Sequence, residues 1–334
     1  HSSTLWYIAA VIILSAIMLI YESMGGMLAV AWTDMIQGGM MLLCLYATFF
    51  LIEHHYGGIQ QTLHILKVTN KSQHLLGLPT LATCRSWLSY ILLVGLGASI
   101  YPQAIQRIFA AKSIPSLNKS FIGMIWLPII IATPVILLGL IAAAHIPHLT
   151  TAQSEQVMPI MLLQVIQHSL FAKVIALLFF AAVLSAIMST ADSVLLSLTS
   201  IIMNDIKKKN KATTHNQYLK QCKLAAFIIL LIFILLAILL RKTTIIKMMD
   251  VKFDILAQLV PAFYLGLYQA KITSKAIVSG LISATVVALC GNIAGYGKIA
   301  NIHIGLYALI LNIIIVYGHP ILIKKWRSMR KQSV

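Results

Sequence analysis

One short stretch of the chain combines small hydroxyl side chains with helical spacing. Within 184–193, Ser and Thr alternate with Ala, Ile and Met. Positions three or four apart share one face of a helix, and those on the polar face are Ala186, Ser189, Thr190, Ser193 and Ser197. Hydroxyl and carbonyl oxygens are the ligands that a hard cation needs. Small residues also favour close packing of membrane helices. The pattern alone therefore leaves two interpretations open, a cation site and a packing face.

Acidic residues are rare, and three of the eight lie in or at the edge of apolar segments, namely Asp34, Asp192 and Asp254. An acidic side chain at the centre of a membrane helix costs at least about 2.5 kcal/mol on insertion scales, so it usually faces a cavity or a partner. Asp34 also lies close to the polar residues Thr33 and Gln37. We expect Asp34 and Asp192 to lie on an ion pathway, with a charge that snorkels to the headgroups as the alternative.

Glycine and proline interrupt one apolar segment. Gly95 and Gly97 lie in its interior, and Pro102 follows. Such residues indicate a broken helix, and broken helices form binding sites in transporters. A simple proline kink with close packing is the alternative. The four cysteines have neither metal-ligand spacing nor the pattern of a disulfide framework.

Long apolar segments must carry these residues. Of 334 residues, 60% are hydrophobic and 10% are charged, whereas a soluble domain carries about 25% charged residues. This excludes an ordinary cytosolic enzyme, a disordered protein and a fibrous protein. A helical span needs about 20 apolar residues, and nine segments are candidates: 5–20, 27–52, 87–111, 121–146, 171–202, 224–240, 252–270, 273–293 and 304–323. We predict an all-α polytopic membrane protein with about nine transmembrane helices, and an external loop or interfacial helix over 53–86.

The net charge of +17 comes from basic residues between the apolar segments, without aromatic interleaving. This pattern is typical of loop charge that sets orientation in a membrane, and it does not favour nucleic acid as a partner. With nine alternating spans, most Lys and Arg fall on the side of the C-terminus, while Arg241, Lys242 and Lys247 oppose the bias. We predict a multi-pass protein of the cell (inner) membrane with a cytoplasmic C-terminus.

Two stretches resemble motifs of the sodium/solute symporter family. The segment 25–37, GGMLAVAWTDMIQ, resembles the family motif GG-x-x-A-V-x-W-T-D-x-x-Q. The segment 181–193, AAVLSAIMSTADS, is similar to the sodium-site helix of the proline-transporter branch. Looser matches follow at Pro102 with Arg107 and at 258–267. The similarity runs along nearly the whole chain.

The resemblance implies a LeuT-like fold with two inverted five-helix repeats in a thirteen-span architecture. Counted back from the sodium-site helix, the nine spans correspond to the fifth to the thirteenth, so the chain looks N-terminally truncated by four spans. We expect a single transporter domain over 1–334. In it, 1–52 is the end of the first repeat, 87–270 is the second repeat, and 273–334 holds the C-terminal helices and a basic tail.

The resemblance also implies ion ligands. The Ala186 carbonyl and the hydroxyls of Ser189 and Thr190 would bind sodium, which is the expected cofactor, with no organic cofactor. Asp34 would lie near the cytoplasmic ion exit, and Asp192 stays on the expected ion pathway.

Solute contacts of the family map onto the interrupted segment, at Gly97, Tyr101, Pro102 and Gln103. The residues at 94 and 98 are Val and Ala, where the proline branch carries aromatic residues. We therefore do not expect proline to be the main solute.

The functional hypothesis is sodium-coupled symport of a small organic solute across the cytoplasmic membrane, incomplete in this chain alone, with no enzymatic chemistry. The expected partners are the solute, the lipid bilayer and a separate N-terminal four-span fragment. Two alternatives remain at this point. One is a membrane sensor module related to transporters fused to histidine kinases, and the other is an inactive truncated remnant.

Overall fold

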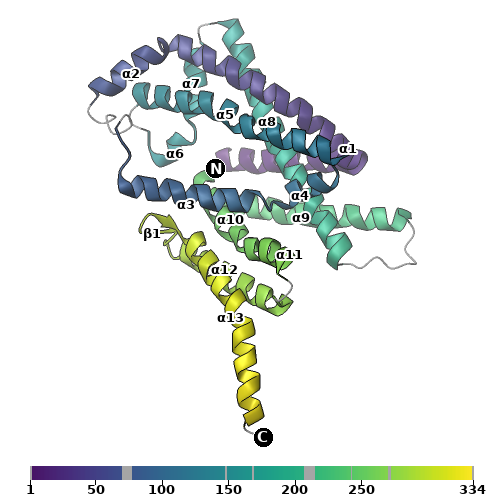
Figure 1. Cartoon of the computed structure of the whole chain (residues 1–334). Coiled ribbons are helices and arrows are strands. Elements are labelled where there is room, and N and C mark those ends of the chain that lie inside the picture. Colours follow the sequence, from purple (N-terminus) through teal and green to yellow (C-terminus); the bar gives the residue numbers. More distant parts are fainter. Residues whose placement is uncertain are drawn as a thin grey trace. The chain divides into compact units, whose positions relative to one another are not determined.

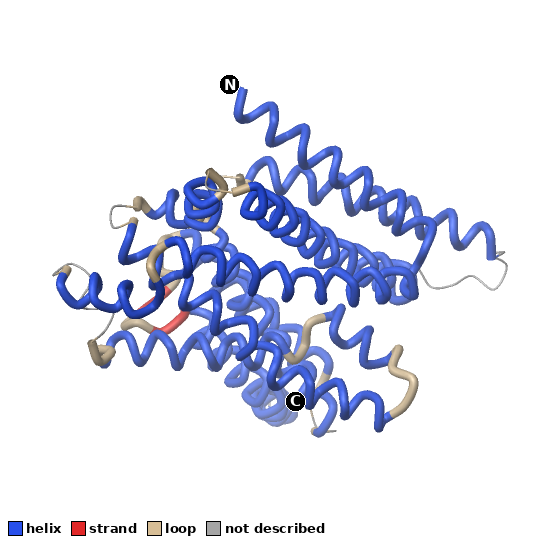
Figure 2. Tube along the Cα trace, turned by 90° about the horizontal axis from the view of Figure 1, so that it is seen from above, coloured by secondary structure: helices blue, strands red, loops and turns tan. Residues whose placement is uncertain are grey.

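The computed structural model describes residues 2–69, 77–146, 149–167, 169–206, 215–241, 243–269 and 272–332. The chain forms two compact units. The first unit comprises 1–77 and 106–242, and the second comprises 78–105 and 243–334. Figure 1 follows the helices of both units along the chain, and Figure 2 shows that helices make up nearly all of the described residues.

The first unit is entirely helical in its described part. Its helices are α1 (Ser2–His55), α2 (Gly58–Val68), α5 (Ile114–His145), α6 (Thr151–Ser154), α7 (Val157–Val165), α8 (Leu170–Ile201) and α9 (His215–Leu239), with a π-helical turn η2 (Ile202–Ile206) after α8. Helix α4 (Pro102–Phe109) crosses the boundary between the segments 78–105 and 106–242. Helix α1 contains two apolar stretches, Leu5–Ile20 and Val30–His55, which run in different directions in Figure 1.

Helix α8 is fixed by packing on several sides within the first unit. Toward its N-terminus, Ala172 and Ala176 belong to a buried cluster with Ile52 of α1, Ile141 of α5 and Met161 of α7. Toward its C-terminus, a second cluster joins α8 to the first stretch of α1 and to α9. The helix starts at a hydroxyl cap, because Ser169 Oγ accepts a hydrogen bond from the backbone N–H of Ala172. Since both ends are packed, the polar face of α8 is held in a defined orientation.

The second unit combines helices with one short hairpin. Its elements are α3 (Leu81–Ala98), α10 (Ile245–Leu256), the 3-10 turn η3 (Ala257–Leu259), the π-helical turn η4 (Pro261–Leu265), α11 (Gly266–Tyr268), α12 (Ser274–Ile293), β1 (Lys298–Ile299), β2 (Ile302–His303) and α13 (Ile304–Gln332). The strands pair antiparallel. Ala300 and Asn301 both have positive φ, 51° and 64°, as a tight two-residue hairpin turn of the type I′ class requires.

Small residues allow α12 and α13 to pack closely. Ala284 and Ala288 of α12 form a buried cluster with Ala308 of α13. Further along the same interface, Gly280 faces the side chain of Asn312, and an added Cβ would have no room there. This is the small-residue packing that membrane helices favour.

The predicted apolar segments correspond well to helices of the structure. Seven helices of the described residues are long and apolar enough to span a membrane, and Leu5–Ile20 and Ile304–Gly318 are shorter apolar helices. The nine predicted segments therefore become seven candidate spans and two shorter ones. Within the polar segment 53–86 lies helix α2. The short helices α6 and α7 and the β-hairpin were not predicted.

The predicted helix break is confirmed. The apolar segment 87–111 is not one helix, because α3 ends at Ala98 and α4 starts at Pro102. Proline suits the first position of a helix, since the N–H that it lacks has no partner there. The segment 252–270 is also irregular, with η3 and η4 between α10 and α11.

Candidate functional site

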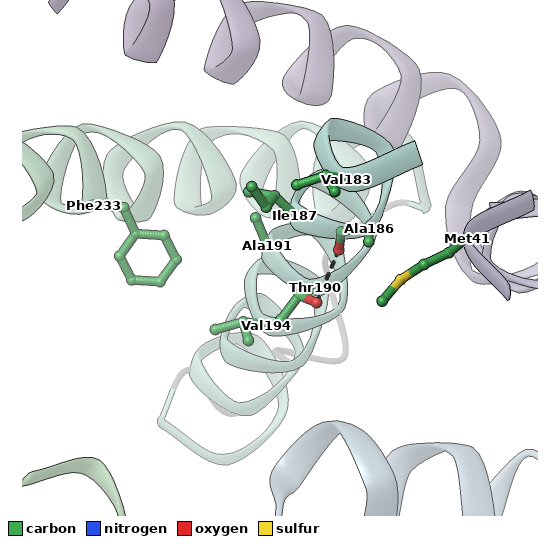
Figure 3. Close-up of a pocket in the computed structure, with 8 residues that line it drawn as sticks. All are labelled: Met41, Val183, Ala186, Ile187, Thr190, Ala191, Val194 and Phe233. Carbon is green, nitrogen blue, oxygen red and sulfur yellow. Dashed lines mark hydrogen bonds between the residues drawn. The ribbon is translucent and has the colours of Figure 1, made fainter. Parts of the chain in front are cut away.

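Two of the predicted ion ligands lie next to each other on α8. The Thr190 hydroxyl donates a hydrogen bond of 3.0 Å to the Ala186 carbonyl, as Figure 3 shows. Both residues line an open pocket whose other walls are apolar and include Ile187, Met41 and Phe233. The two oxygen atoms are therefore the polar groups that α8 presents to this pocket.

Ser189, the third predicted ligand, is directed toward α1. Its hydroxyl donates a hydrogen bond to Asp34 Oδ1. A serine hydroxyl has two lone pairs that stay available when its proton is donated, so this bond does not prevent Ser189 from binding a cation. The structure thus brings the predicted ion-pathway residue Asp34 into direct contact with a predicted ion ligand.

Asp34 also has a cationic partner, Arg107 of α4. The guanidinium forms an ion pair with the carboxylate through Nη2 and Oδ2, and the same Nη2 donates a bond of 2.7 Å to Ser193 Oγ of α8. The Asp34 side chain is 16% exposed and the Arg107 side chain is 54% exposed. The carboxylate is thus largely buried and neutralised from one side.

The polar face of α8 continues beyond this pair. Ser197 Oγ lies 2.8 Å from Gln106 Oε1 and 2.7 Å from the Ser193 carbonyl, and can donate to either. Gln106 Nε2 donates to Ser200 Oγ at 3.3 Å. The predicted face at Ser189, Ser193 and Ser197 is therefore hydrogen-bonded along its length. Helix α1 supplies the partner of Ser189, and α4 supplies partners of Ser193 and Ser197.

Two acidic residues lie away from this network. Asp192 of α8 is buried, and its Oδ1 atom has no hydrogen-bond partner among the described residues. Asp254 of α10 is fully buried in the second unit, where it accepts bonds from Asn292 Nδ2 at 2.8 Å and the Gly305 N–H at 2.9 Å. The structure joins Asp34 to the ion ligands but does not join Asp192 to them.

The predicted solute residues lie at the break between α3 and α4. Gly97 is buried in the last turn of α3, where an added Cβ would lie 3.0 Å from Phe253 Cδ1. Tyr101 precedes Pro102, and its ring packs edge-on against Phe253 with the centroids 6.0 Å apart. Pro102 and Gln103 form the first turn of α4 and are partly buried. The glycine thus permits close contact between the break and α10.

The break is also held from η4. The Tyr264 hydroxyl donates to Ser99 Oγ at 3.0 Å, and Ser99 in turn donates to the Leu96 carbonyl at 2.7 Å. A second polar contact of this unit lies near the hairpin. There His303 Nδ1 is 2.8 Å from Ser89 Oγ, and Nε2 is 3.7 Å from Asp250 Oδ1.

Sequence reasoning missed the roles of Gln106, Arg107 and His303. For Arg107 a signal was present, since it belongs to the looser motif match that begins at Pro102. Burial lowers the pKa of His303, the nearby Lys298 lowers it further, and Asp250 opposes both effects. No sequence signal singled out His303, because its partners lie far away along the chain.

Comparison with known proteins gives matches along most of the chain. The family model of the sodium:solute symporter family matches residues 2–284. The osmoregulated proline transporter OpuE of Bacillus subtilis is 34% identical over 193 residues, which cover 58% of this chain and 38% of that protein. The sodium/proline symporter of Staphylococcus aureus (strain JH9) is 28% identical over 340 residues, which cover 96% of this chain and 63% of that protein. The chain thus spans about two fifths to two thirds of the length of these relatives.

A solved structure shows the same fold. It is a substrate-bound, outward-open state of a Na+-coupled sialic acid symporter, with a TM-score of 0.72 at 21% identity, and the match covers 94% of this chain and 66% of that one. The predicted all-α, multi-pass membrane protein with a LeuT-like fold is therefore confirmed. Together with the family-model match over residues 2–284, this establishes that the chain belongs to the sodium:solute symporter family.

Proposed function

We propose that the chain contributes the later spans of a sodium-coupled symporter that carries a small organic solute across the cytoplasmic membrane. One observation carries the proposal. The Ala186 carbonyl, the Thr190 hydroxyl and the Ser189 hydroxyl lie within one turn of α8, and Ser189 contacts the carboxylate of Asp34. Hard-cation oxygen ligands and a nearby negative charge thus come together. The named relatives are transporters, which favours transport over a sensor role or enzymatic chemistry.

The residues fit a sodium ion in chemical type. Sodium prefers oxygen ligands, as other hard cations do. Helix α8 supplies one carbonyl oxygen and two hydroxyl oxygens, about one helical turn apart. When sodium binds, the Thr190 hydroxyl would turn its lone pairs toward the ion, because its present bond to the Ala186 carbonyl uses only its proton. The remaining ligands would come from other helices of the complete transporter.

Coupling to a solute needs a second site, which we place at the break between α3 and α4. Gly97, Tyr101, Pro102 and Gln103 are its proposed contacts. Sodium and solute would each bind better when the other is present, and such coupling is reciprocal by thermodynamic necessity. Alternating exposure of the sites to the two sides of the membrane would then move both.

The orientation and the partner belong to the same proposal. The distribution of Lys and Arg along the sequence favours a cytoplasmic C-terminus, which we propose. Because the relatives are longer than the matched region, we propose that a four-span N-terminal fragment completes the sodium site. Expression of 1–334 alone, and then together with the four preceding spans of a longer family member, tests this through sodium-driven uptake in vesicles. Equal uptake by the lone chain would contradict the need for the fragment.

The decisive experiment removes the two hydroxyl ligands. In the uptake-competent protein, Ser189→Ala with Thr190→Ala should raise the apparent dissociation constant for sodium at least about tenfold, because each lost ligand costs roughly 1 kcal/mol. A control is Ser120→Ala with Thr133→Ala on α5, whose hydroxyls donate to backbone carbonyls one turn back, as the Thr190 hydroxyl does. The control should leave the sodium constant unchanged. An unaltered sodium constant in the first variant would overturn the assignment.

A further inference from the structure

Lys252 of α10 is a basic residue inside a candidate membrane span. The span runs from Ile245 to Tyr268. The ammonium Nζ lies 3.1 Å from Met249 Sδ and 4.5 Å from the centre of the Phe253 ring. Among the described residues, neither ion pair includes Lys252. A charged residue within a span usually pairs with a partner or lines a substrate path, and here a thioether and aromatic rings take the place of a carboxylate.

The acidic residues of the same helix point elsewhere. Asp250 faces His303, and Asp254 is held by Asn292 and Gly305. Residues four apart share a face of a helix, whereas a residue midway between them lies on the opposite side. Lys252 is midway between the two aspartates. Helix α10 therefore has an acidic side, whose carboxylates contact His303, Asn292 and Gly305, and a basic side for which the described residues provide no anionic partner.

The basic side of α10 lies at the proposed solute site. The Lys252 ammonium is 5.4 Å from the centre of the Tyr101 ring, and Tyr101 is the residue just before α4. The same region of α10 contacts Gly97 through Phe253. Lys252 thus belongs to the wall that faces the break between α3 and α4, within the second unit.

The start of α4 adds positive potential at the same place. The N–H groups of its first turn have no carbonyl partner within the helix, and the helix dipole makes this end favourable for anions. Pro102 lacks an N–H, so Gln103 and Ala104 carry the free groups. An ammonium and a helix N-terminus next to the same tyrosine are a combination that suits a carboxylate.

We propose that Lys252 binds a carboxylate group of the transported solute, so that the transporter selects anionic or zwitterionic carboxylates over neutral solutes. This inference rests on the proposed function and on the solute site at the helix break. The carboxylate oxygen would replace the Met249 sulfur, which is a weak acceptor, and a charge-assisted hydrogen bond would form at about 2.7–2.9 Å. The buried Phe253 ring shields one side of the ammonium from water, which strengthens the ion pair.

The test is uptake selectivity in the sodium-competent protein. Vesicles are offered a library of small carboxylates, each paired with its primary amide, under an inward sodium gradient. We expect the accumulated solutes to be carboxylates, with their amides taken up at least about tenfold less efficiently, because the charge-assisted hydrogen bond to Lys252 is lost. If no solute accumulates, whether carboxylate, amide or any other, the proposed symport function is contradicted. If amides accumulate as well as their carboxylates, only the inference about Lys252 fails.

Variants of Lys252 separate its charge from a structural role. Lys252→Gln should raise KM for the carboxylate about 10- to 100-fold, leave uptake of the amide unchanged, and keep the sodium-induced thermal shift. Lys252→Arg should retain selectivity for the carboxylate. Lys247→Gln, an exposed change on the same helix, is the matched control and should change neither KM. Equal effects of Lys252→Gln on the KM values of carboxylate and amide would overturn the assignment. It would also be overturned if uptake required chloride but did not require a carboxylate group on the solute.

Discussion

Arg107→Met tests the central ion pair of the polar network. The methionine keeps an unbranched apolar stem, shorter than that of arginine, and removes every donor. Two contacts are lost, one to the Asp34 carboxylate and one to Ser193 Oγ. Among the described residues, Asp34 would then keep its bond from Ser189 alone. Two opposite effects follow, a loss of stability and a gain in affinity for a cation.

The loss of stability should be moderate. A hydrogen bond to a charged group contributes about 1.5–3 kcal/mol when buried, while an exposed ion pair contributes about 0.2–1 kcal/mol. The Asp34 side chain is 16% exposed but the Arg107 side chain is 54% exposed, so water screens the pair from the arginine side. We expect destabilisation of about 1–2 kcal/mol, seen as a lower melting temperature in detergent or nanodiscs.

The gain in sodium affinity follows from Coulomb's law. Arg107 places a positive charge next to Asp34, and Asp34 contacts the proposed sodium ligand Ser189. If the guanidinium and the bound ion are taken to be roughly 8 Å apart in an effective dielectric constant of about 20, the unit charge changes the energy of the bound cation by about 2 kcal/mol. Removal of the guanidinium should therefore lower the apparent sodium constant by about three- to thirtyfold. Sodium-dependent thermal shifts measure this without transport.

A double-mutant cycle with Asp34→Asn isolates the pair. Because the two side chains form an ion pair, the double variant should be more stable than the sum of the two single losses predicts, by about 1 kcal/mol. Arg85→Met, an exposed arginine of the second unit, is the matched control and should change neither stability nor sodium affinity. Strict additivity in the cycle, or a weaker sodium response in Arg107→Met, would refute the reasoning.

Three further predictions concern the second unit. Asn292→Ala removes the donor to Asp254 Oδ2 and should cost about 1–3 kcal/mol, so an unchanged melting temperature would contradict the buried network. Burial holds the pKa of His303 below its ordinary 6.5, so the unfolded chain binds the proton more readily than the folded chain does. The free energy of unfolding should therefore be constant above about pH 6.5 and fall below it. Thermal melts at about pH 7.5, 6.5 and 5.5 measure this fall, and His303→Gln should abolish it. Proline should not be the main solute, since Val94 and Ala98 offer little contact area; saturable sodium-driven proline uptake at micromolar concentration would show this to be wrong.

The positions of the spans were predictable because each depends on its own stretch of chain. Apolar length alone located the segments 121–146 and 171–202, which the structure describes as α5 and α8. The break near Pro102 was predictable for the same reason, since proline limits its own backbone and that of its neighbour. The helical spacing of Ser189 and Thr190 likewise fixed which α8 residues share a face.

The partners of those residues depended on tertiary structure. Arg107 is 73 positions from Asp34, and Ser189 is 155 positions from it, and periodicity within a segment carries no information on contacts at such separations. Asp192 shows the same limit. In the structure it is buried, and its Oδ1 has no hydrogen-bond partner among the described residues. The sequence could not distinguish this position from one beside Asp34. The sequence by itself determined the membrane helices and which hydroxyl-bearing residues of α8 share a face. Only the packing of α4 against α8, and of α10 against the helix break, decided which charged side chains lie beside those residues and beside the break, since that depends on how helices distant in sequence meet.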